Sequence, residues 1–327
     1  MKINSNDIHE VLKLSRADNI SFIGTGDITY IVAHEQKDVD FRSQIIKKIY
    51  DGGEGQTLIK RDILKLVPKN CYVEITEDTI IAGKRKIKYK PNELIDKHLI
   101  VENHLTTIEG KELDHLLSGY YAMATDMTRP ILNGICIQNN EFAACDGFRI
   151  TVRKGNFKAT EQVVMDLNMV NTLKKIKCDK NVEVYYNDRY VKFIFGDLEV
   201  VGNRVEGNFI NYKSIIPEYH TRSTTLETKE LVNILKNYKK NKFEFVKLNF
   251  TTDNLIVNAS NEIASIEDKT CIKLKGEPLE IAFNINYLID SLNSYKTTTL
   301  ELIAAVCPMV LKAENKLDLV LPVRIRD

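Results

Sequence analysis

The chain has 327 residues, of which 43% are hydrophobic and 28% are charged, and its formal net charge is +1. This length is too great for one ordinary hydrophobic core and predicts two or three globular domains of about 100 to 150 residues. The balanced charge gives no global sign of nucleic-acid or membrane binding, so any contact with DNA has to come from a local arrangement of charge.

The cysteines and the first residues indicate the compartment in which the protein works. The six cysteines contain no CxxC pair, and residues 1–13 lack the apolar run of a signal peptide. Both features favour free thiols in a reducing, cytoplasmic environment. The longest apolar run, residues 302–311, is interrupted by Pro308 and is too short to cross a bilayer, so we expect no membrane association.

Six short segments along the chain have the apolar spacing of an amphipathic helix and recur about every 55 residues. Strand-like runs lie between them, at residues 182–186, 190–195 and 243–250 among others. Because two helices can cover a sheet that one helix cannot, the repeat predicts an α+β protein of three similar domains, each with two helices. Chance repetition of a short apolar pattern is the alternative. The segments are 5–13, 60–69, 110–118, 167–175, 228–236 and 284–292, and their anchor residues are Ile8, Ile63, Leu113, Val170, Leu231 and Leu288.

The helix side opposite the anchors is basic on average. None of the residues two positions before an anchor is acidic, although Glu10 and Asp290 interrupt the pattern elsewhere on the same side. A plain solvated face is the alternative for any single helix. Recurrence favours loose, sequence-independent contacts with the phosphates of double-stranded DNA. The candidate DNA-facing residues are Arg61, Lys65, Lys69, Lys111, Lys174, Lys175, Lys229, Lys236 and Lys240.

A β-meander is predicted over residues 128–154. Two apolar runs, 131–138 and 141–145, are separated by a tight turn at Asn139-Asn140. Asp146-Gly147 makes a second bend before a third strand, 148–152. An ordinary meander without a special function is one interpretation of this pattern.

The residues of the meander also carry a family resemblance. TRPILNG followed by CDGFR resembles the signature of the bacterial sliding clamp, the beta subunit of DNA polymerase III. NRVEGNFINYKSIIP (203–217) and LDLVLPVRI (317–325) resemble two further parts of the same signature, in the same order. The resemblance is good from about residue 103 to the end of the chain and weak before it.

The resemblance implies a DNA-clamp fold whose three domains each pack two helices on antiparallel sheets and close as a head-to-tail dimeric ring. We place the domains at 1–101, 102–217 and 218–327. Such a ring encircles duplex DNA and tethers the replicative polymerase. The resemblance implies neither catalysis nor a cofactor or metal.

The resemblance also implies a groove between the second and third domains. The DNA polymerase catalytic subunit and the clamp loader bind there through linear peptide motifs. Cys145 and Phe148 stand where the family more often has threonine and histidine, so the preferred peptide can differ here. The matching peptide-binding residues are Leu132, Gly147, Phe148, Arg149, Ile150, Pro217, Pro308, Val320, Leu321, Pro322, Val323 and Arg324.

The first domain departs most from the family. Little sequence separates the first helical segment from residues 20–33, so its early strands look trimmed. In the family this domain docks against the third domain of the partner, and Ile87 and Tyr89 in KRKIKYK are the candidate dimer contacts. An ordinary edge strand protected by lysines is the alternative.

Two other functions remain as hypotheses. A divergent clamp-fold interaction protein would bind partner peptides without a stable ring on DNA. An enzyme on an unrelated repeat fold is disfavoured, because Gly24-Thr25-Gly26 lacks the third glycine of a dinucleotide loop and the histidines show no metal-ligand spacing.

Overall fold

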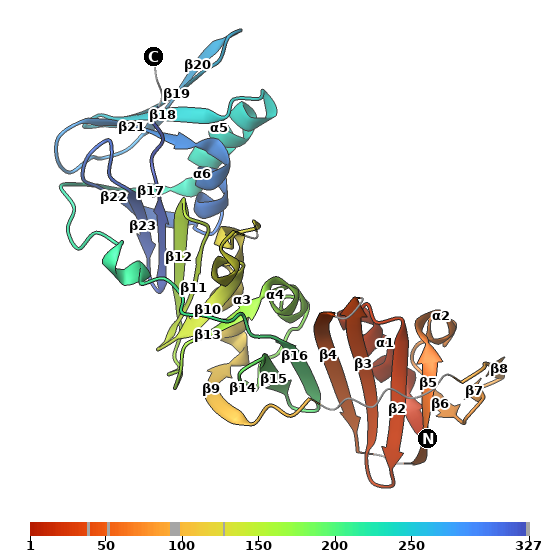
Figure 1. Ribbon diagram of the computed structural model, residues 1–327. Coiled ribbons are helices and arrows are strands. Elements are labelled where there is room, and N and C mark those ends of the chain that lie inside the picture. The colour runs from red at the N-terminus through yellow and green to blue at the C-terminus, as the bar shows by residue number, and fades with distance from the viewer. Residues whose placement is uncertain (38–39, 51–52, 92–98, 127, 325–327) are drawn as a thin grey trace. The chain divides into compact units, whose positions relative to one another are not determined.

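The same order of secondary-structure elements occurs three times along the chain. The computed structural model describes the chain except for residues 38–39, 51–52, 92–98, 127 and 325–327, so Ile325 of the terminal motif lies outside the described residues. Each set has one strand, one helix, four strands, one helix and three strands (Figure 1). The predicted α+β class and the predicted repeat are therefore confirmed.

The elements of the first set have the following bounds. They are β1 (Lys2–Asn4), α1 (Ser5–Leu14), β2 (Asn19–Thr25), β3 (Thr29–Lys37), β4 (Asp40–Ile49), β5 (Glu54–Lys60), α2 (Arg61–Leu64), β6 (Tyr72–Ile75), β7 (Thr79–Ala82) and β8 (Arg85–Lys88).

The second set also contains four short 3₁₀ turns. Its strands and helices are β9 (Asn103–Glu109), α3 (Leu113–Leu117), β10 (Gly134–Gln138), β11 (Glu141–Cys145), β12 (Arg149–Lys154), β13 (Val163–Asp166), α4 (Leu167–Leu173), β14 (Asn181–Tyr186), β15 (Tyr190–Phe195) and β16 (Leu198–Asn203). The 3₁₀ turns are η1 (Gly110–Glu112), η2 (Tyr120–Ala122), η3 (Pro130–Leu132) and η4 (Tyr212–Ser214).

The third set ends close to the C-terminus. It comprises β17 (Arg222–Glu227), α5 (Thr228–Lys240), β18 (Phe245–Phe250), β19 (Asn254–Ser260), β20 (Ser265–Cys271), β21 (Leu279–Asn284), α6 (Ile285–Leu292), β22 (Thr297–Leu302), β23 (Met309–Ala313) and β24 (Lys316–Val320).

The chain packs as two compact units, each made of several segments. The first unit contains Met1–Asp114, Ile137–Asn140 and Asn156–Gly207. Its eight-stranded sheet has the order β5-β2-β3-β4-β16-β15-β14-β9, and a four-stranded sheet has the order β1-β6-β7-β8. All neighbours in both sheets are antiparallel, and β4 joins β16 from Ser43↔Gly202 to Lys47↔Leu198.

The second unit contains His115–Cys136, Glu141–Gly155 and Asn208–Asp327. Six of its strands are neighbours in the order β11-β12-β24-β23-β22-β17, and four more form the sheet β20-β19-β18-β21. Helices α5 and α6 lie beside each other (Figure 1), and their apolar stripes pack into one core with Phe250 and Phe283. This burial is the main stabilising contribution to the unit.

All six predicted helices are present. Five of the six anchors are buried, but Ile63 is only half-buried and the adjacent Leu64 takes its place in the core. Helix α2 has a single turn, so the choice of inward residue depends on its neighbours rather than on a repeated stripe.

The predicted meander is correct for its second strand and wrong for the start of its first. Strand β11 has the predicted bounds 141–145, whereas β10 begins at Gly134 and not at Ile131. Pro130 occupies the first position of η3, where its fixed φ and missing N–H favour a helical turn over a strand. Asn139 has a positive φ of 51°, as the predicted tight turn requires.

The expectation of trimmed early strands in the first domain is also wrong. The first set has its full complement of strands, and β2, β3 and β4 have 7, 9 and 10 residues. The shortening falls later, because β6, β7 and β8 have four residues each while β14, β15 and β16 have six.

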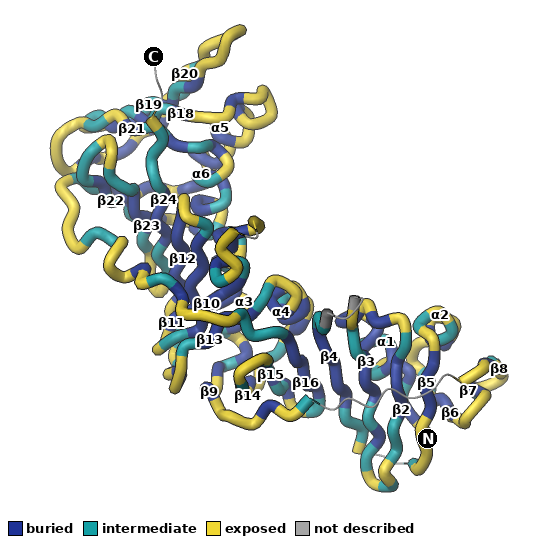
Figure 2. Tube along the Cα trace, in the orientation of Figure 1, coloured by how far each residue is buried: buried dark blue, intermediate teal, exposed yellow. Residues whose placement is uncertain are grey.

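Strand β8 lies at the end of its sheet within the described residues, as the lysine-rich pattern predicts. Figure 2 shows most of β8 itself as exposed. Tyr89 is nevertheless buried, with an exposed fraction of 8%, and its hydroxyl donates to the carbonyl of Thr76 at 2.5 Å. Its side chain therefore supports its own unit and cannot reach a partner, which leaves the half-buried Ile87 as the dimer candidate. No helix among the described residues is both long and apolar enough to span a membrane.

Candidate partner groove and basic helix faces

Two of the sequence motifs meet in the second unit. Strand β12, which follows the CDGFR bend, pairs with β24 so that Arg149 faces Val320 and Ile150 faces Leu319. Beyond the ladder, the backbone N–H of Leu321 donates to the carbonyl of Phe148 at 2.9 Å. The bend and the terminal segment therefore form one continuous surface.

The bend is fixed by its own side chains. Asp146 Oδ1 accepts from the backbone N–H groups of Phe148 and Arg149, both at 2.9 Å. Gly147 has φ +90°, a conformation that other residues adopt only with strain. The thiol of Cys145 accepts from the N–H of Gly147 at 3.3 Å, and burial raises the pKa of that thiol. Cys145 therefore supports the bend from within the core.

Arg149 is committed to the unit itself. Its guanidinium contacts Asp146 Oδ2 at 2.8 Å and Asp290 Oδ2 at 2.7 Å, and it donates to the carbonyl of Tyr121 at 2.8 Å. Burial lowers the pKa of Arg149, but the hydrogen bonds with Asp290 and Asp146 outweigh it and raise the pKa overall. Arg149 was predicted as a peptide-binding residue, and in the structure its guanidinium holds α6 against β12.

Asp290 was predicted to lie among basic residues on the helix side opposite the anchors, and the structure gives it a specific partner. Its side chain is 42% exposed, but its carboxylate is held by Arg149 from a distant part of the chain. One sequence cannot pair residues so far apart, so Asp290 and Tyr121 were not recognised as parts of the site.

An exposed aromatic pair stands beside the bend. Phe148 is 56% exposed, and its ring stacks on Tyr287 of α6 with centroids 5.7 Å apart and an interplanar angle of 23°. The guanidinium carbon of Arg149 lies 4.5 Å from the centre of the Tyr287 ring. Leu321, Pro322 and Val323 are half-buried and Arg324 is exposed. An apolar ledge with the exposed Arg324 at its end is suited to an apolar peptide anchor.

The remaining predicted groove residues have different positions. Ile150, Val320 and Leu132 are buried, with exposed fractions of 3%, 0% and 3%, so they can support a peptide only from beneath. Pro308 directly precedes Met309, the register partner of Val320, and so lies next to the ledge. Pro217 follows η4 and is half-buried, and its place in a groove stays a prediction.

The predicted basic faces are partly occupied by internal partners. Lys65 pairs with Asp62 at 2.7 Å and Lys111 with Glu109 at 2.6 Å. Arg61 donates to the carbonyl of Leu12, and Lys175 to that of Leu14 at 3.3 Å. Lys69, Lys229, Lys236 and Lys240 have exposed side chains, and Lys174 is half-buried.

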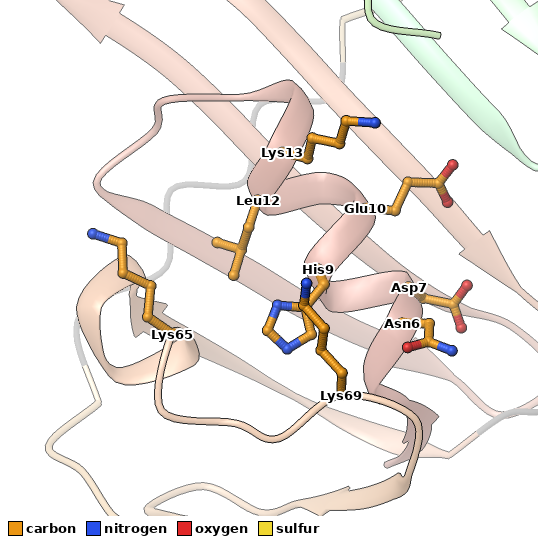
Figure 3. A pocket seen from close by; sticks show the side chains of 8 residues that line it. All are labelled: Asn6, Asp7, His9, Glu10, Leu12, Lys13, Lys65 and Lys69. Carbon is orange, nitrogen blue, oxygen red and sulfur yellow. The ribbon is translucent and has the colours of Figure 1, made fainter. Parts of the chain in front are cut away.

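Helix α1 and the segment that follows α2 line an open hollow in the first unit (Figure 3). Lys65 and Lys69 line one side of it and Lys13 lies on the other. The two acidic residues of α1 in this hollow share one cation with a third carboxylate, because Lys47 lies 2.8 Å from Glu10, 3.8 Å from Asp7 and 3.0 Å from Asp197. Asp7 and Glu10 therefore still interrupt the basic rim that Lys13, Lys65 and Lys69 form.

Comparisons with known proteins place this geometry in a family. The model of the DNA polymerase III beta subunit central domain matches residues 107–211, and that of its C-terminal domain matches residues 213–323. The chain belongs to the family of the DNA polymerase III beta subunit.

Relatives and solved structures of the family agree with this assignment. The beta sliding clamp of Synechococcus elongatus is 26% identical over 303 residues, which cover 81% of this chain and 79% of that protein. The beta sliding clamp of Pseudomonas putida is 24% identical over 267 residues, covering 74% and 72%.

Likeness of fold extends over the whole chain. The DNA polymerase sliding clamp of Pseudomonas aeruginosa has a TM-score of 0.86 at 17% identity, and the beta subunit of Streptococcus pyogenes has 0.85 at 19%. Each likeness covers 99% of both chains. The predicted clamp fold is therefore confirmed, and the first domain takes part in it despite its divergent sequence.

Proposed function

We propose that this protein is a DNA sliding clamp, which encircles duplex DNA and tethers the replicative polymerase for processive synthesis. The observation that carries this function is the threefold order of elements, shared over 99% of the chain with solved sliding clamps. Members of this family are non-catalytic processivity factors, and the proposal needs no cofactor. We propose the cytoplasm as its place of action, as for a clamp of a bacterial DNA polymerase III.

A closed ring of two subunits would contain twelve helices. At about 10 Å per helix, the ring of helices has a circumference near 120 Å and leaves a hole of roughly 28 Å. That hole admits a duplex with a layer of water. Exposed lysines such as Lys229, Lys236 and Lys240 would meet phosphates without reading bases, so that retention comes from topology rather than from affinity.

The ring is proposed to close where strand β8 of one subunit pairs with strand β20 of its partner. Strand β8 presents Arg85, Lys86 and Lys88, and β20 of the second unit presents Glu267 among its exposed residues. Both strands end their sheets within the described residues. Two unpaired strand edges support head-to-tail pairing, with Ile87 as the apolar contact and Glu267 as an available partner for a cation of β8, although Lys269 of β20 is exposed as well.

Partner binding is proposed at the ledge of Phe148, Tyr287, Leu321 and Pro322. Linear peptides of the DNA polymerase catalytic subunit and of the clamp loader would insert an apolar side chain there. A Leu321→Ala or Pro322→Ala substitution should weaken such binding, with the exposed Leu66→Ala of the first unit as a matched control. Unchanged affinity in both groove variants would remove the ledge from the proposal.

Ring formation is tested by solution mass and by retention on DNA. Light scattering should give twice the chain mass of 37.5 kDa. The dimer, once loaded, should stay on closed circular DNA and leave the same DNA after linearisation. A monomer that binds peptides but is not retained on circles would instead establish an interaction protein with a clamp fold. The complete first set of elements gives that alternative no structural support.

A further inference from the structure

A charged carboxylate is buried at the start of β11. Glu141 is 5% exposed, and burial raises its pKa, but hydrogen bonds from Tyr212 and Lys213 outweigh burial and lower the pKa overall. Its Oε2 accepts from the hydroxyl of Tyr212 at 2.6 Å and lies 3.0 Å from Lys213 Nζ, while its Oε1 lies 3.6 Å from Lys154 Nζ. Both lysine side chains are more than half exposed, so the tyrosine is the partner that shares the burial of the carboxylate.

Tyr212 belongs to the connector, residues 204–221, which joins β16 to β17. Along this connector the chain leaves the first unit after Gly207 and enters the second unit at Asn208. Tyr212 is 1% exposed and packs edge-on against the buried ring of Phe209, with ring centroids 6.3 Å apart. Two buried rings and one buried hydrogen bond therefore fix the connector just after it enters the second unit.

The backbone of Tyr212 sets the course of the residues that follow. Its carbonyl accepts from the N–H groups of Ile215 at 3.0 Å and Ile216 at 3.3 Å, which closes the turn η4. The side chain of Ile215 is exposed, and the predicted groove residue Pro217 follows it two positions later. The position of residues 215–217 therefore depends on where Tyr212 is held.

Strand β11 also supports the ledge. Glu141 is its first residue and Cys145 its last, and the bend that carries Phe148 follows directly. The strand pairs with β12 over its whole length, and it spans about 13 Å from its first to its last Cα. The connector is thus attached at one end of a stiff strand and the bend at the other, so both are positioned by the same element.

A fixed connector favours the binding of a linear peptide. A peptide that contacts a loose segment has to order it, and the free energy of that ordering is lost from the affinity. A contribution to stability alone is the alternative, because a buried hydrogen bond also stabilises the unit. The two roles can be separated, since an apolar pair can restore stability without holding the connector in place.

We propose that Glu141 is a positioning residue for partner peptides, which acts through Tyr212 to hold residues 215–217 in their binding position. The inference rests on the proposed peptide-binding function and adds two residues to it that do not themselves touch the peptide. A carboxylate suits this role because it accepts from the tyrosine hydroxyl and from two lysines at once, so the direction of the hydroxyl is fixed.

Three full-length variants separate positioning from stability. Tyr212→Phe removes only the hydroxyl. Glu141→Leu combined with Tyr212→Phe removes both polar partners and leaves an apolar pair, so most of the melting temperature lost in Tyr212→Phe should return. The matched control is Tyr238→Phe, which removes another buried tyrosine hydroxyl of the second unit, one that donates to the carbonyl of Val257 at 2.8 Å.

The first readout is affinity for a labelled synthetic peptide. The probe is the tightest wild-type binder among overlapping peptides that tile the DNA polymerase catalytic subunit of the same organism. Tyr212→Phe and the double variant should each bind it about five- to tenfold more weakly, as expected if roughly one molecule in five to ten holds the connector in its binding position. Tyr238→Phe should keep the wild-type affinity. An affinity that returns together with the melting temperature in the double variant would overturn the positioning role.

The second readout is amide hydrogen exchange, which needs no peptide. The N–H groups of Ile215 and Ile216 should exchange faster in Tyr212→Phe and in the double variant, and at the wild-type rate in the control. Unchanged exchange overturns the proposal, and so does faster exchange with unchanged affinity. If the double variant does not fold, Tyr212→Phe against Tyr238→Phe decides by the same two readouts.

Failure of the proposed function has a different signature. If none of the tiled peptides binds wild type, the partner-binding function is refuted. Hydrogen exchange then still decides whether Glu141 holds residues 215–217.

Discussion

The ion pair between Arg153 and Asp318 should be essential to the second unit. Both side chains are fully buried, and Nη1 of Arg153 lies 2.6 Å from Oδ1 of Asp318. The pair joins β12 to β24, the two strands that carry the groove motifs. Arg153 also donates to Ser118 Oγ at 2.9 Å and to the hydroxyl of Tyr121 at 3.2 Å.

An Asp318→Ala substitution would leave the guanidinium of Arg153 buried without its counter-charge. Breaking a buried pair in this way costs about 3–5 kcal/mol. For a unit of about 150–250 residues, each kcal/mol lowers the melting temperature by about 2–4 °C. The transition of the second unit should therefore fall by roughly 6–20 °C.

Differential scanning calorimetry measures this shift, and a second variant identifies its cause. Replacing both partners, Arg153→Met with Asp318→Leu, removes the two charges together and should restore most of the lost stability. The reasoning is refuted if Asp318→Ala melts within about 2 °C of wild type. It is also refuted if the double replacement is less stable than Asp318→Ala.

Three further predictions concern the ledge, the first unit and pH. Phe148→Ala should weaken binding of a partner peptide about tenfold, because it removes the exposed ring stacked on Tyr287. Calorimetric titration measures this affinity. The control is Ile263→Ala, at a 93% exposed residue of the same unit, which should leave the affinity unchanged. Lys47→Met should destabilise the first unit by about 1.5–3 kcal/mol. The carboxylates of Glu10 and Asp197, which lie 2.8 Å and 3.0 Å from Lys47 Nζ, would lose their shared cation. Calorimetry measures the melting transition of each unit, and a lower transition of the second unit instead of the first would contradict this. Burial lowers the pKa of His115 below its ordinary value of 6.5. As pH falls below 6.5, the unfolded chain therefore takes up a proton at this histidine more readily than the folded chain does. The free energy of unfolding is highest above pH 6.5 and declines below it. His115→Gln should flatten the fall in melting temperature of the second unit between about pH 8 and pH 5, and an unaltered fall would show that another group titrates.

The sequence predicted those features that depend on local periodicity. Each helical segment carries its own apolar stripe, so residues 228–236 indicated α5 and 284–292 indicated α6 without knowledge of the rest of the chain. Strand β15 has its predicted bounds for the same reason, because Val191, Phe193 and Phe195 alternate with less buried residues. Where the helix is too short for a repeated stripe, as in the single turn of α2, the prediction named Ile63 as the buried anchor, whereas Leu64 is the buried residue.

Features that depend on distant partners were not predictable. Arg149 looked like a free guanidinium because Asp290, which neutralises it, lies in a helix of another sequence repeat. Tyr89 looked exposed because it alternates with lysines, yet its hydroxyl reaches Thr57 at 2.9 Å. The CDGFR motif indicated the bend but not Tyr287, whose only sequence signal is its place one residue before the anchor Leu288 of α6.

The ladder between β4 and β16 has a mechanical consequence. It joins strands of the first and second sets over five residue pairs and makes them one continuous sheet. A load directed along these strands is shared by the whole ladder at once, whereas a load that peels the strands apart meets one pair at a time. Bending at this junction must therefore be spread over the twist of the eight-stranded sheet. The junction should resist bending and should not act as a hinge.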